Sequence, residues 1–139
     1  MRDAYEVDDD PLRIDVGVVW QFLSTEAYWN RWRSREDVER QWRGAWRVVG
    51  VYGSDGAMVG GARAISDGVS DAYLGDMFVV PPHRGRGLAK RLLSTMIDEG
   101  PGRDFRWMLV TSDAHGLYAQ FGFAAPDERV MVRPPRITN

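Results

Sequence analysis

The segment from Arg84 to Lys90 contains two arginines, two glycines and a lysine. It follows an apolar run that stops at Pro81-Pro82, and a stretch with apolar residues at helical spacing comes directly after it. Glycine allows a backbone to approach a ligand closely, and the first turn of a helix offers unpaired N–H groups and a partial positive charge. A loop of this kind can bind phosphate groups, with the basic side chains around it.

Two other interpretations of this segment are open on its composition alone. A turn between a strand and a helix, with solvated arginines, is what an arbitrary cluster of glycine and arginine most often forms. Nucleic-acid binding through such repeats is less consistent, because the repeats usually lie in disordered or strongly basic regions. This chain has a net charge of −2, and the segment lies between two regular elements, so we expect no nucleic-acid partner.

Common phosphate-binding motifs narrow the choice of ligand. The P-loop of nucleotide-binding proteins needs Gly-Lys followed by Ser or Thr, and that sequence is absent from the loop. The dinucleotide fingerprint Gly-x-Gly-x-x-Gly could begin at Gly85, but Lys90 stands where its third glycine is needed. Neither motif therefore explains the segment.

The composition is that of an ordinary globular protein, with 44% hydrophobic and 27% charged residues, and we expect one domain over residues 1–139. The absence of cysteine excludes disulfides, thiolate metal sites and a cysteine nucleophile. His83 and His115 are too far apart in the sequence to indicate a metal site. With no apolar signal core and no apolar run of membrane-spanning length, we expect a cytoplasmic protein without a metal or a membrane partner.

Hydrophobic periodicity predicts two helices in the first third of the chain. Asp15 is a candidate N-cap for a helix that ends near Ser24. Ser34 and Asp37 resemble a capping pair for a second helix over 35–43. A short strand at 5–7 precedes both helices, and the stretch between them is predicted to be a loop.

The hydrophobic period then changes to that of strands, with a helix between some of them. Strands are predicted at 45–53, 57–68, 72–80, 106–111 and 129–133. Helices are predicted at 85–97 and 115–121. The prolines at 81–82 end the third of these strands, because proline cannot donate to a β-ladder. The order indicates a mixed α/β sheet with a strand–helix–strand unit in the second half.

Residues 84–89, Arg-Gly-Arg-Gly-Leu-Ala, match the pattern Arg/Gln-x-x-Gly-x-Gly/Ala that marks acetyl-CoA binding in the GNAT family of N-acyltransferases. An apolar strand that ends in Val-Val-Pro precedes the match, and an amphipathic helix follows it. Residues 113–123, DAHGLYAQFGF, resemble the second motif of that family. The two helices of the first half resemble its N-terminal helices, so the resemblance covers nearly the whole chain in the expected order.

The resemblance implies an α/β fold with a mixed, mostly antiparallel, twisted sheet, splayed middle strands and about four flanking helices. It implies transfer of an acetyl group from acetyl-CoA, the acyl donor, to a primary amine of an acceptor. A non-catalytic acyl-CoA-binding sensor or interaction domain of the same fold is the alternative. The identity of the acceptor and the oligomeric state stay open, with a homodimer as one option.

The resemblance also implies how acetyl-CoA is held. Backbone groups of one strand would pair with the pantetheine arm, and the N–H of Val79 would face the thioester carbonyl as an oxyanion donor. The loop over 84–90 would hold the pyrophosphate. The residues implied in CoA binding are Phe78, Val79, Val80, Arg84, Gly85, Arg86, Gly87, Leu88, Ala89, Lys90, Asp113, His115, Tyr118 and Phe121.

Tyr118 stands where the family has its general acid, so the resemblance implies that it protonates the leaving thiolate; packing against the sulfur is the other role open to it. A phenol's pKa of about 10 lies above a thiol's of about 8.5, so this transfer needs a site that tunes both groups. Asp76 is the candidate base for the acceptor amine, although a salt bridge is an equally good interpretation. Asp71, Glu26, His115 or a water chain are the alternatives.

The acceptor pocket is expected to be built from side chains of the loop between the first two helices and of the central strands. Aromatic walls suit an acceptor with an apolar or cationic part, although the aromatic residues could equally pack in the core. The candidates for acceptor binding are Tyr28, Trp29, Trp32, Arg63 and Asp76.

Overall fold

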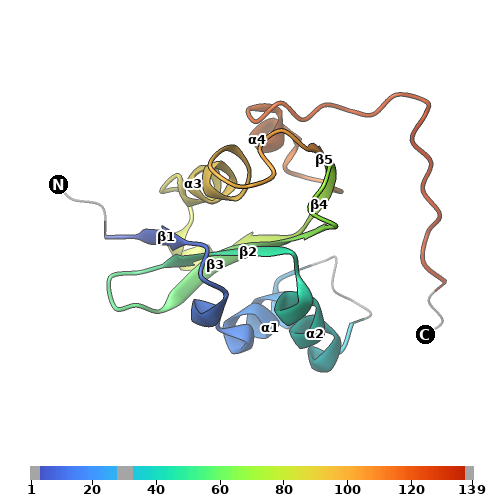
Figure 1. Cartoon of the computed structure of the whole chain (residues 1–139). Helices are drawn as coiled ribbons and strands as arrows, with labels where there is room; N and C mark the ends of the chain where they lie inside the picture. Colours follow the sequence, from blue (N-terminus) through green and yellow to red (C-terminus); the bar gives the residue numbers. More distant parts are fainter. Residues whose placement is uncertain (1–3, 28–32, 137–139) are drawn as a thin grey trace.

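A five-stranded sheet with the order β1-β2-β3-β4-β5 forms the centre of the fold (Figure 1). The structure is a computed structural model that describes residues 4–27 and 33–136. Its strands are β1 (Glu6–Asp8), β2 (Arg47–Tyr52), β3 (Met58–Ser66), β4 (Asp71–Val79) and β5 (Arg106–Met108). Neighbouring strands are antiparallel, except that β4 and β5 are parallel. The sheet is therefore mixed and mostly antiparallel, as the resemblance implied.

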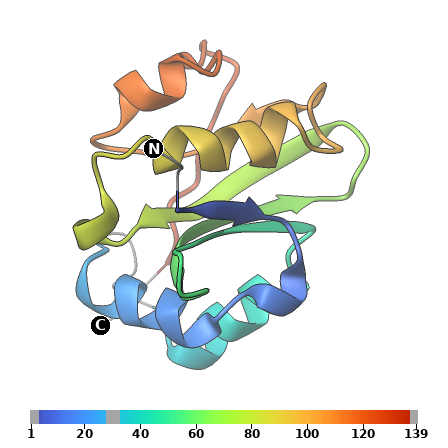
Figure 2. The ribbon, with the colours of Figure 1, turned by 90° about the vertical axis from the view of Figure 1, so that its left-hand side faces the viewer.

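Helices cover both faces of this sheet (Figures 1 and 2). Helices α1 and α2 lie on one face, and α3 and α4 lie on the other. The helical elements are η1 (Pro11–Arg13), α1 (Val16–Thr25), α2 (Arg35–Gly44), η2 (Pro81–His83), α3 (Leu88–Leu93), η3 (Ser94–Asp98) and α4 (His115–Ala119). None of the helices within residues 4–27 and 33–136 is long and apolar enough to cross a membrane.

The first two helices begin where the sequence predicts. The carboxylate of Asp15 accepts hydrogen bonds from the N–H groups of Gly17 and Val18. Ser34 and Asp37 form a reciprocal capping box, in which each side chain accepts from the backbone N–H of the other at 3.1 Å. These side chains satisfy N–H groups that the first turn of a helix leaves unpaired.

Apolar side chains form a core on each face of the sheet. On one face, α3 and η3 pack Leu88, Leu92 and Met96 against buried residues of β2, β3 and β4. On the other face, α1 and α2 pack against β2 and β4, where the rings of Phe22 and Phe78 stack with centroids 4.7 Å apart. Each face of β4 therefore packs against helices.

The helix predicted over 85–97 starts later and ends in a different geometry. Gly85 and Gly87 both have positive φ, so the chain turns before it enters α3 at Leu88. From Ser94 to Asp98 the helix widens into a π-helical turn. The side chain of Arg47 donates to two backbone carbonyls of this turn, which compensates for the altered pattern of backbone hydrogen bonds.

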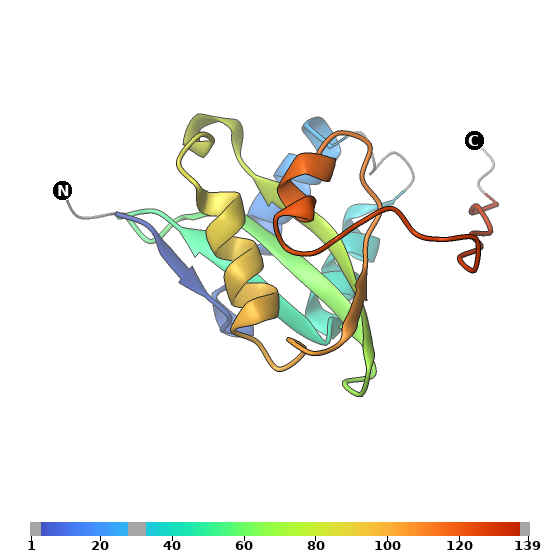
Figure 3. The same ribbon diagram turned by 90° about the horizontal axis from the view of Figure 1, so that it is seen from above.

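The strand predicted at 129–133 is wrong, because this segment is irregular and pairs with none of the strands described. Val130, Met131 and Val132 are exposed. After α4 the chain passes β5 without pairing with it and continues beyond the edge of the sheet (Figures 1 and 3). Alternating apolar residues favour a strand only where a partner edge is available to them, and this segment does not engage one.

β4 contains a β-bulge at its middle. Gly61 pairs with Phe78 and Arg63 pairs with Gly75, so β4 has one residue more than β3 between the two pairs. Asp76 lies in the bulge with a φ of 54°, a left-handed conformation that is uncommon for residues other than glycine. A bulge bends its strand and increases the local twist, and here it lies where β4 leaves its neighbour β5.

β4 and β5 diverge after a short parallel ladder. Residues 71–73 of β4 pair with residues 106–108 of β5, and the ladder goes no further, although the sequence predicts a strand as far as 111. Beyond this ladder, the edge of β4 that faced β5 has no strand partner among the described residues. A splay is therefore present, but it lies between β4 and β5, the last two strands of the described sheet, and not between its middle strands.

Replacing Leu92 with alanine tests the core beneath α3. Leu92 is fully buried, so Leu92→Ala should lower the free energy of unfolding by about 2–5 kcal/mol, because apolar contacts are lost and a cavity remains. Leu12 is 92% exposed, and the matched Leu12→Ala variant should change that free energy by less than about 0.5 kcal/mol. Urea unfolding measures both; equal losses would contradict this core.

Candidate active site

A cavity of about 940 Å³ opens where β4 and β5 diverge. One wall is β4 over residues 73–79, and another is the segment 109–111 after β5 together with part of α4. The loop before α3 also lines the cavity, as do Glu26 and Arg33 from the α1–α2 region. Residues from both halves of the chain therefore line this one cavity.

The loop before α3 presents its backbone to this cavity. Gly85 and Gly87 have φ values of 80° and 74°, in the left-handed region that residues with a Cβ adopt at a cost. A Cβ at either position would meet no heavy atom within 4 Å, so the backbone conformation, not crowding, requires glycine. Gly87 is the N-cap of α3, and Lys90 lines the cavity in the first turn. This arrangement suits an anion.

The two arginines of the loop are held in different ways. Arg84 Nε donates to the backbone carbonyl of Val79 at 2.9 Å. The guanidinium of Arg86 lies 5.9 Å from the centre of the Tyr5 ring, and Arg86 does not line the cavity. The hydroxyl of Tyr5 in turn shares a 2.7 Å hydrogen bond with His83 Nδ1. The beginning of the chain thereby fastens this loop.

Of the three backbone positions predicted to meet the pantetheine arm, Val79 has its N–H directed to the open edge of β4. The N–H of Val80 donates to the Val59 carbonyl at 2.9 Å, so it faces β3 and is already used. Because N–H directions alternate along a strand, the N–H of Phe78 also faces β3 and that of Val79 faces away from it. The N–H groups of Phe78 and Val80 are therefore directed to β3 and not to the arm.

Tyr118 projects from α4 toward β4. Its hydroxyl donates to Met77 Sδ at 3.7 Å, and both residues line the cavity. Met77 is two residues from Val79 along β4. The phenol and the outward N–H of β4 therefore belong to the same cavity.

The structure places some of the other residues predicted around α4 in the cavity and others outside it. Asp113 lines the cavity together with positions 114, 117 and 118, of which the last three follow the spacing of a single helix face. His115 and Phe121 are not lining residues. Phe121 follows the end of α4 and packs against the core on the α3 face, so the structure does not bring these two predicted residues into the site.

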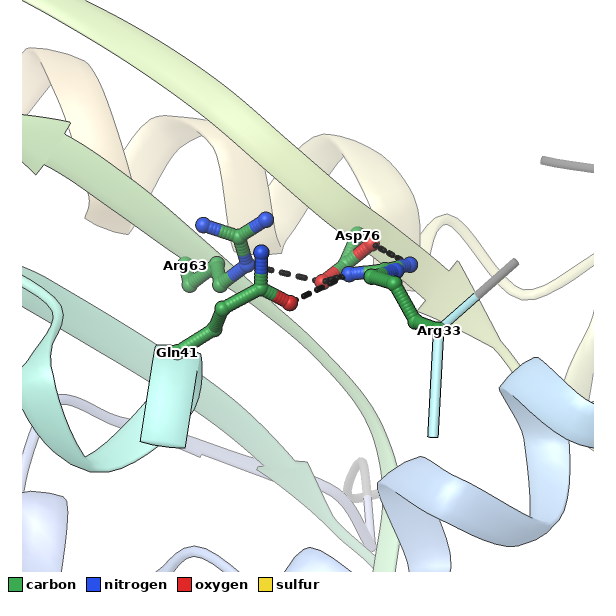
Figure 4. Close-up of polar contacts among 4 residues, drawn as sticks. All are labelled: Arg33, Gln41, Arg63 and Asp76. Carbon is green, nitrogen blue, oxygen red and sulfur yellow. Dashed lines mark hydrogen bonds and ion pairs between the residues drawn. The ribbon is translucent and has the colours of Figure 1, made fainter. Parts of the chain in front are cut away.

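Asp76 lies in a buried cluster of charges (Figure 4). Arg33 donates to both of its carboxylate oxygens at 2.8 Å, and Arg63 Nε donates to one of them at 2.7 Å. The side-chain oxygen of Gln41 accepts from Arg33 at 2.7 Å. The side chains of Asp76, Arg33 and Arg63 are only 3%, 4% and 8% exposed. The cluster joins the α1–α2 connection, α2, β3 and the bulge of β4.

This cluster determines the protonation of Asp76. Burial raises the pKa of the carboxyl, but hydrogen bonds and charges from Arg33 and Arg63 outweigh it, and the pKa of Asp76 lies below its ordinary value of 3.8. A carboxylate with a low pKa and both oxygens engaged is a weak proton acceptor at neutral pH. The geometry therefore argues against Asp76 as the base and supports the salt-bridge interpretation.

The alternative bases lie in different places. Asp71 accepts a hydrogen bond from Arg106 at 2.9 Å and, like His115, does not line the cavity. Glu26 is exposed at the end of α1 and does line it. Among the described residues, no group of three or more histidine or acidic side chains could hold a metal ion.

The predicted acceptor residues are only partly tested by the structure. Arg63 and Asp76 line the cavity, whereas Tyr28, Trp29 and Trp32 lie outside the described residues. Arg33 belongs to the site but was missed, because the sequence marks its segment only as a loop. The one signal that could have found it is the need of a buried aspartate for a cationic partner.

Replacing Asp76 with asparagine tests the buried cluster. The amide keeps the size of the side chain but leaves two buried guanidinium groups without their carboxylate, so the free energy of unfolding at pH 7 should fall by about 3–5 kcal/mol. The folded-state pKa of Asp76 is below 3.8. The ionised Asp76 carboxylate therefore stabilises the folded state above its unfolded-state pKa, and this stabilisation is lost as the pH falls below about 4.

The measurement is urea unfolding of wild type and Asp76→Asn at pH 7 and at pH 3, where the difference between them should shrink. Asp104 is 91% exposed, and the matched Asp104→Asn variant should change the stability by less than about 0.5 kcal/mol. A loss for Asp76→Asn that stays the same at both pH values would contradict a charge-based role for the cluster.

Comparisons with known proteins agree with this geometry. The acetyltransferase (GNAT) family model matches residues 15–123. A solved structure from Xanthomonas campestris, provisionally assigned to the GNAT family, is 36% identical in sequence and has a TM-score of 0.87, over 94% of this chain and 93% of that chain. A provisionally named acetyltransferase of Gibberella zeae is 25% identical over an alignment that covers 86% of this chain and 78% of the relative.

The same fold occurs in a provisionally assigned acetyltransferase of Clostridium acetobutylicum that was solved with acetyl-CoA. It has a TM-score of 0.69 and 17% identity, over 93% of this chain and 96% of that chain. The GNAT family uses acetyl-CoA as its acyl donor. With the family match extending over most of its length, this chain belongs to the GNAT family and is an acetyl-CoA-dependent acyltransferase.

Proposed function

We propose that this acyltransferase moves the acetyl group of acetyl-CoA to a primary amine by direct attack of the amine nitrogen. The observation that carries the proposal is the geometry at the open edge of β4. The N–H of Val79 faces the cavity, and the hydroxyl of Tyr118 reaches Met77 on the same strand. A hydrogen-bond donor for a carbonyl oxygen and a proton donor for a sulfur atom thus share one cavity.

The chain's own residues suit acetyl-CoA in two places. The loop over 84–90 has left-handed glycines with open space around them and a lysine in the next turn, which suits a pyrophosphate. The open edge of β4 suits an extended arm that adds to the sheet like a strand, with Val79 as its main-chain partner. Bound in this way, acetyl-CoA supplies an activated acetyl thioester.

The proton transfers can be assigned to residues that line the cavity. An acceptor ammonium must lose one proton before attack, to Glu26 or to water, and a second proton as the C–N bond forms. As the C–S bond breaks, Tyr118 gives its proton to the sulfur and is reprotonated by the second proton from the amine. The products are the N-acetylated acceptor and the CoA thiol. Asp76 takes no proton and instead holds Arg33 and Arg63 in place.

Acetyl-CoA should stabilise the folded protein by mass action, by about 2.7 kcal/mol at 100 times its Kd. Gly87→Ala should weaken this binding, because alanine is strained at a φ of 74° and disturbs the backbone N–H groups of the loop. Gly44 has open space around it and no positive φ, so Gly44→Ala is the matched control. The readout is the melting temperature as a function of acetyl-CoA concentration.

Wild type and Gly44→Ala should show the same increase in melting temperature, and Gly87→Ala a smaller one. If millimolar acetyl-CoA produces no shift while ATP does, the loop binds phosphate but the assignment of the acyl donor to this site fails. Equal binding by all three proteins would show that the left-handed loop is not used.

Tyr118→Phe separates the proposed acid from a packing residue. The variant keeps the ring and loses the hydroxyl, so kcat for free-thiol production with an amine acceptor should fall by about 100-fold or more. The Kd for acetyl-CoA, measured by calorimetry on the same samples, should be unchanged. An unchanged kcat would exclude Tyr118 as the acid and leave it a packing role.

A screen of amines that includes polyamines, aminoglycosides, amino acids and peptides supplies the acceptor for this assay. Acetyl-CoA binding without thiol release for any amine would instead favour the acyl-CoA-binding sensor over the enzyme that transfers to amines.

A further inference from the structure

Arg63 has a buried guanidinium group whose outer edge is not used by the fold. Its side chain is 8% exposed, and its Nε is engaged with Asp76 at 2.7 Å. Among the described residues, neither of its two Nη nitrogens has a hydrogen-bond partner, and Arg63 is one of the residues that line the cavity. In Figure 4 these two nitrogens point away from the carboxylate of Asp76.

The charges of the cluster do not cancel. Among the described residues, the guanidinium groups of Arg33 and Arg63 share the carboxylate of Asp76, so these three side chains together carry one positive charge. Arg33 engages both carboxylate oxygens, whereas Arg63 engages one of them through Nε alone. The Nη edge of Arg63 therefore carries buried positive charge without a hydrogen-bond partner among the described residues, which is costly unless an anion meets it.

The neighbouring strand β4 restricts the direction of the Nη edge of the Arg63 guanidinium. Gly75 is the register partner of Arg63 on β4, and a Cβ at Gly75 would lie 3.3 Å from both Cζ and Nη2 of Arg63. The absence of a side chain at Gly75 thus leaves the guanidinium room to lie against β4. With Asp76 holding Nε, the two Nη groups form a fork of parallel donors whose geometry matches a carboxylate.

We propose that the acceptor carries a carboxylate close to its amine, as an amino acid does, and that Arg63 binds this carboxylate. The proposal rests on the amine acetylation proposed above and names its substrate class. Glu26 lines the same cavity and is exposed, so it offers a partner to the ammonium group of such a zwitterion. Arg63 is then a specificity-determining residue, and Asp76 and Gly75 position it.

A matched pair of acceptors tests this recognition directly. Each L-amino acid is compared with its own α-carboxamide, which keeps the side chain and the amine but removes the negative charge. With saturating acetyl-CoA, kcat/KM from free-thiol production should be about 10- to 100-fold higher for the preferred amino acid than for its carboxamide. In parallel, the amino acid should raise the melting temperature of the CoA-saturated protein more than the carboxamide does.

Two variants connect this preference to Arg63. Arg63→Gln should raise KM for the amino acid by about 10-fold or more, leave KM for the carboxamide nearly unchanged and preserve acetyl-CoA binding. Gly75→Ala should reduce the same preference by displacing the guanidinium without removing it. Arg43→Gln is the matched control, because Arg43 is 71% exposed on α2 and forms its ion pair with Glu39 of the same helix, and it should leave the preference intact.

The outcomes separate this proposal from the acetyl transfer on which it rests. If carboxamides or simple amines are acetylated as well as amino acids, the carboxylate site is overturned and amine acetylation stands. If no amine is acetylated but amino acids still bind the CoA-saturated protein better than carboxamides, and Arg63→Gln abolishes this, the carboxylate site stands and the acetylation fails. A preference for ethanolamine phosphate over β-alanine overturns the carboxylate in favour of a phosphate.

Discussion

The carboxylate of Asp76, held between Arg33 and Arg63, connects three parts of the fold through buried ion pairs. The two arginines come from the α1–α2 connection and from β3, and the carboxylate comes from the bulge of β4. Desolvating three charges is costly, and the bidentate geometry offsets that cost. Because the bulge lies where β4 departs from β5, this cluster also helps to fix the shape of the cavity.

Local features of the site could be predicted from the sequence because they depend on a few neighbouring residues. Asp15 and the Ser34–Asp37 pair cap their helices as expected, since capping is decided within one turn. Gly85 and Gly87 adopt the left-handed conformations that only glycine adopts easily. The order of strands and helices likewise indicates the mixed sheet, because the hydrophobic period of each element is a local property of the sequence.

Features that depend on distant partners could not be predicted. Arg33 and Asp76 are 43 positions apart, and nothing in the loop around Arg33 marks it as an ion-pair partner. From the sequence, Asp76 is therefore a candidate base, and only its two guanidinium partners exclude that role. The segment 129–133 has the pattern of a strand, but whether a strand forms depends on an available edge. The use of the Val80 N–H by Val59 is likewise a matter of register.

Tyr5 connects the beginning of the chain to the loop before α3. Its hydroxyl bonds His83 and its ring lies beneath Arg86, while its carbonyl accepts from Arg91 at 3.2 Å. These contacts make Tyr5, just ahead of β1, a support of the proposed CoA site. A bulky affinity tag or fusion partner joined directly ahead of β1 would pull on that support, so a purified protein prepared in this way should bind acetyl-CoA less tightly than one whose tag has been removed.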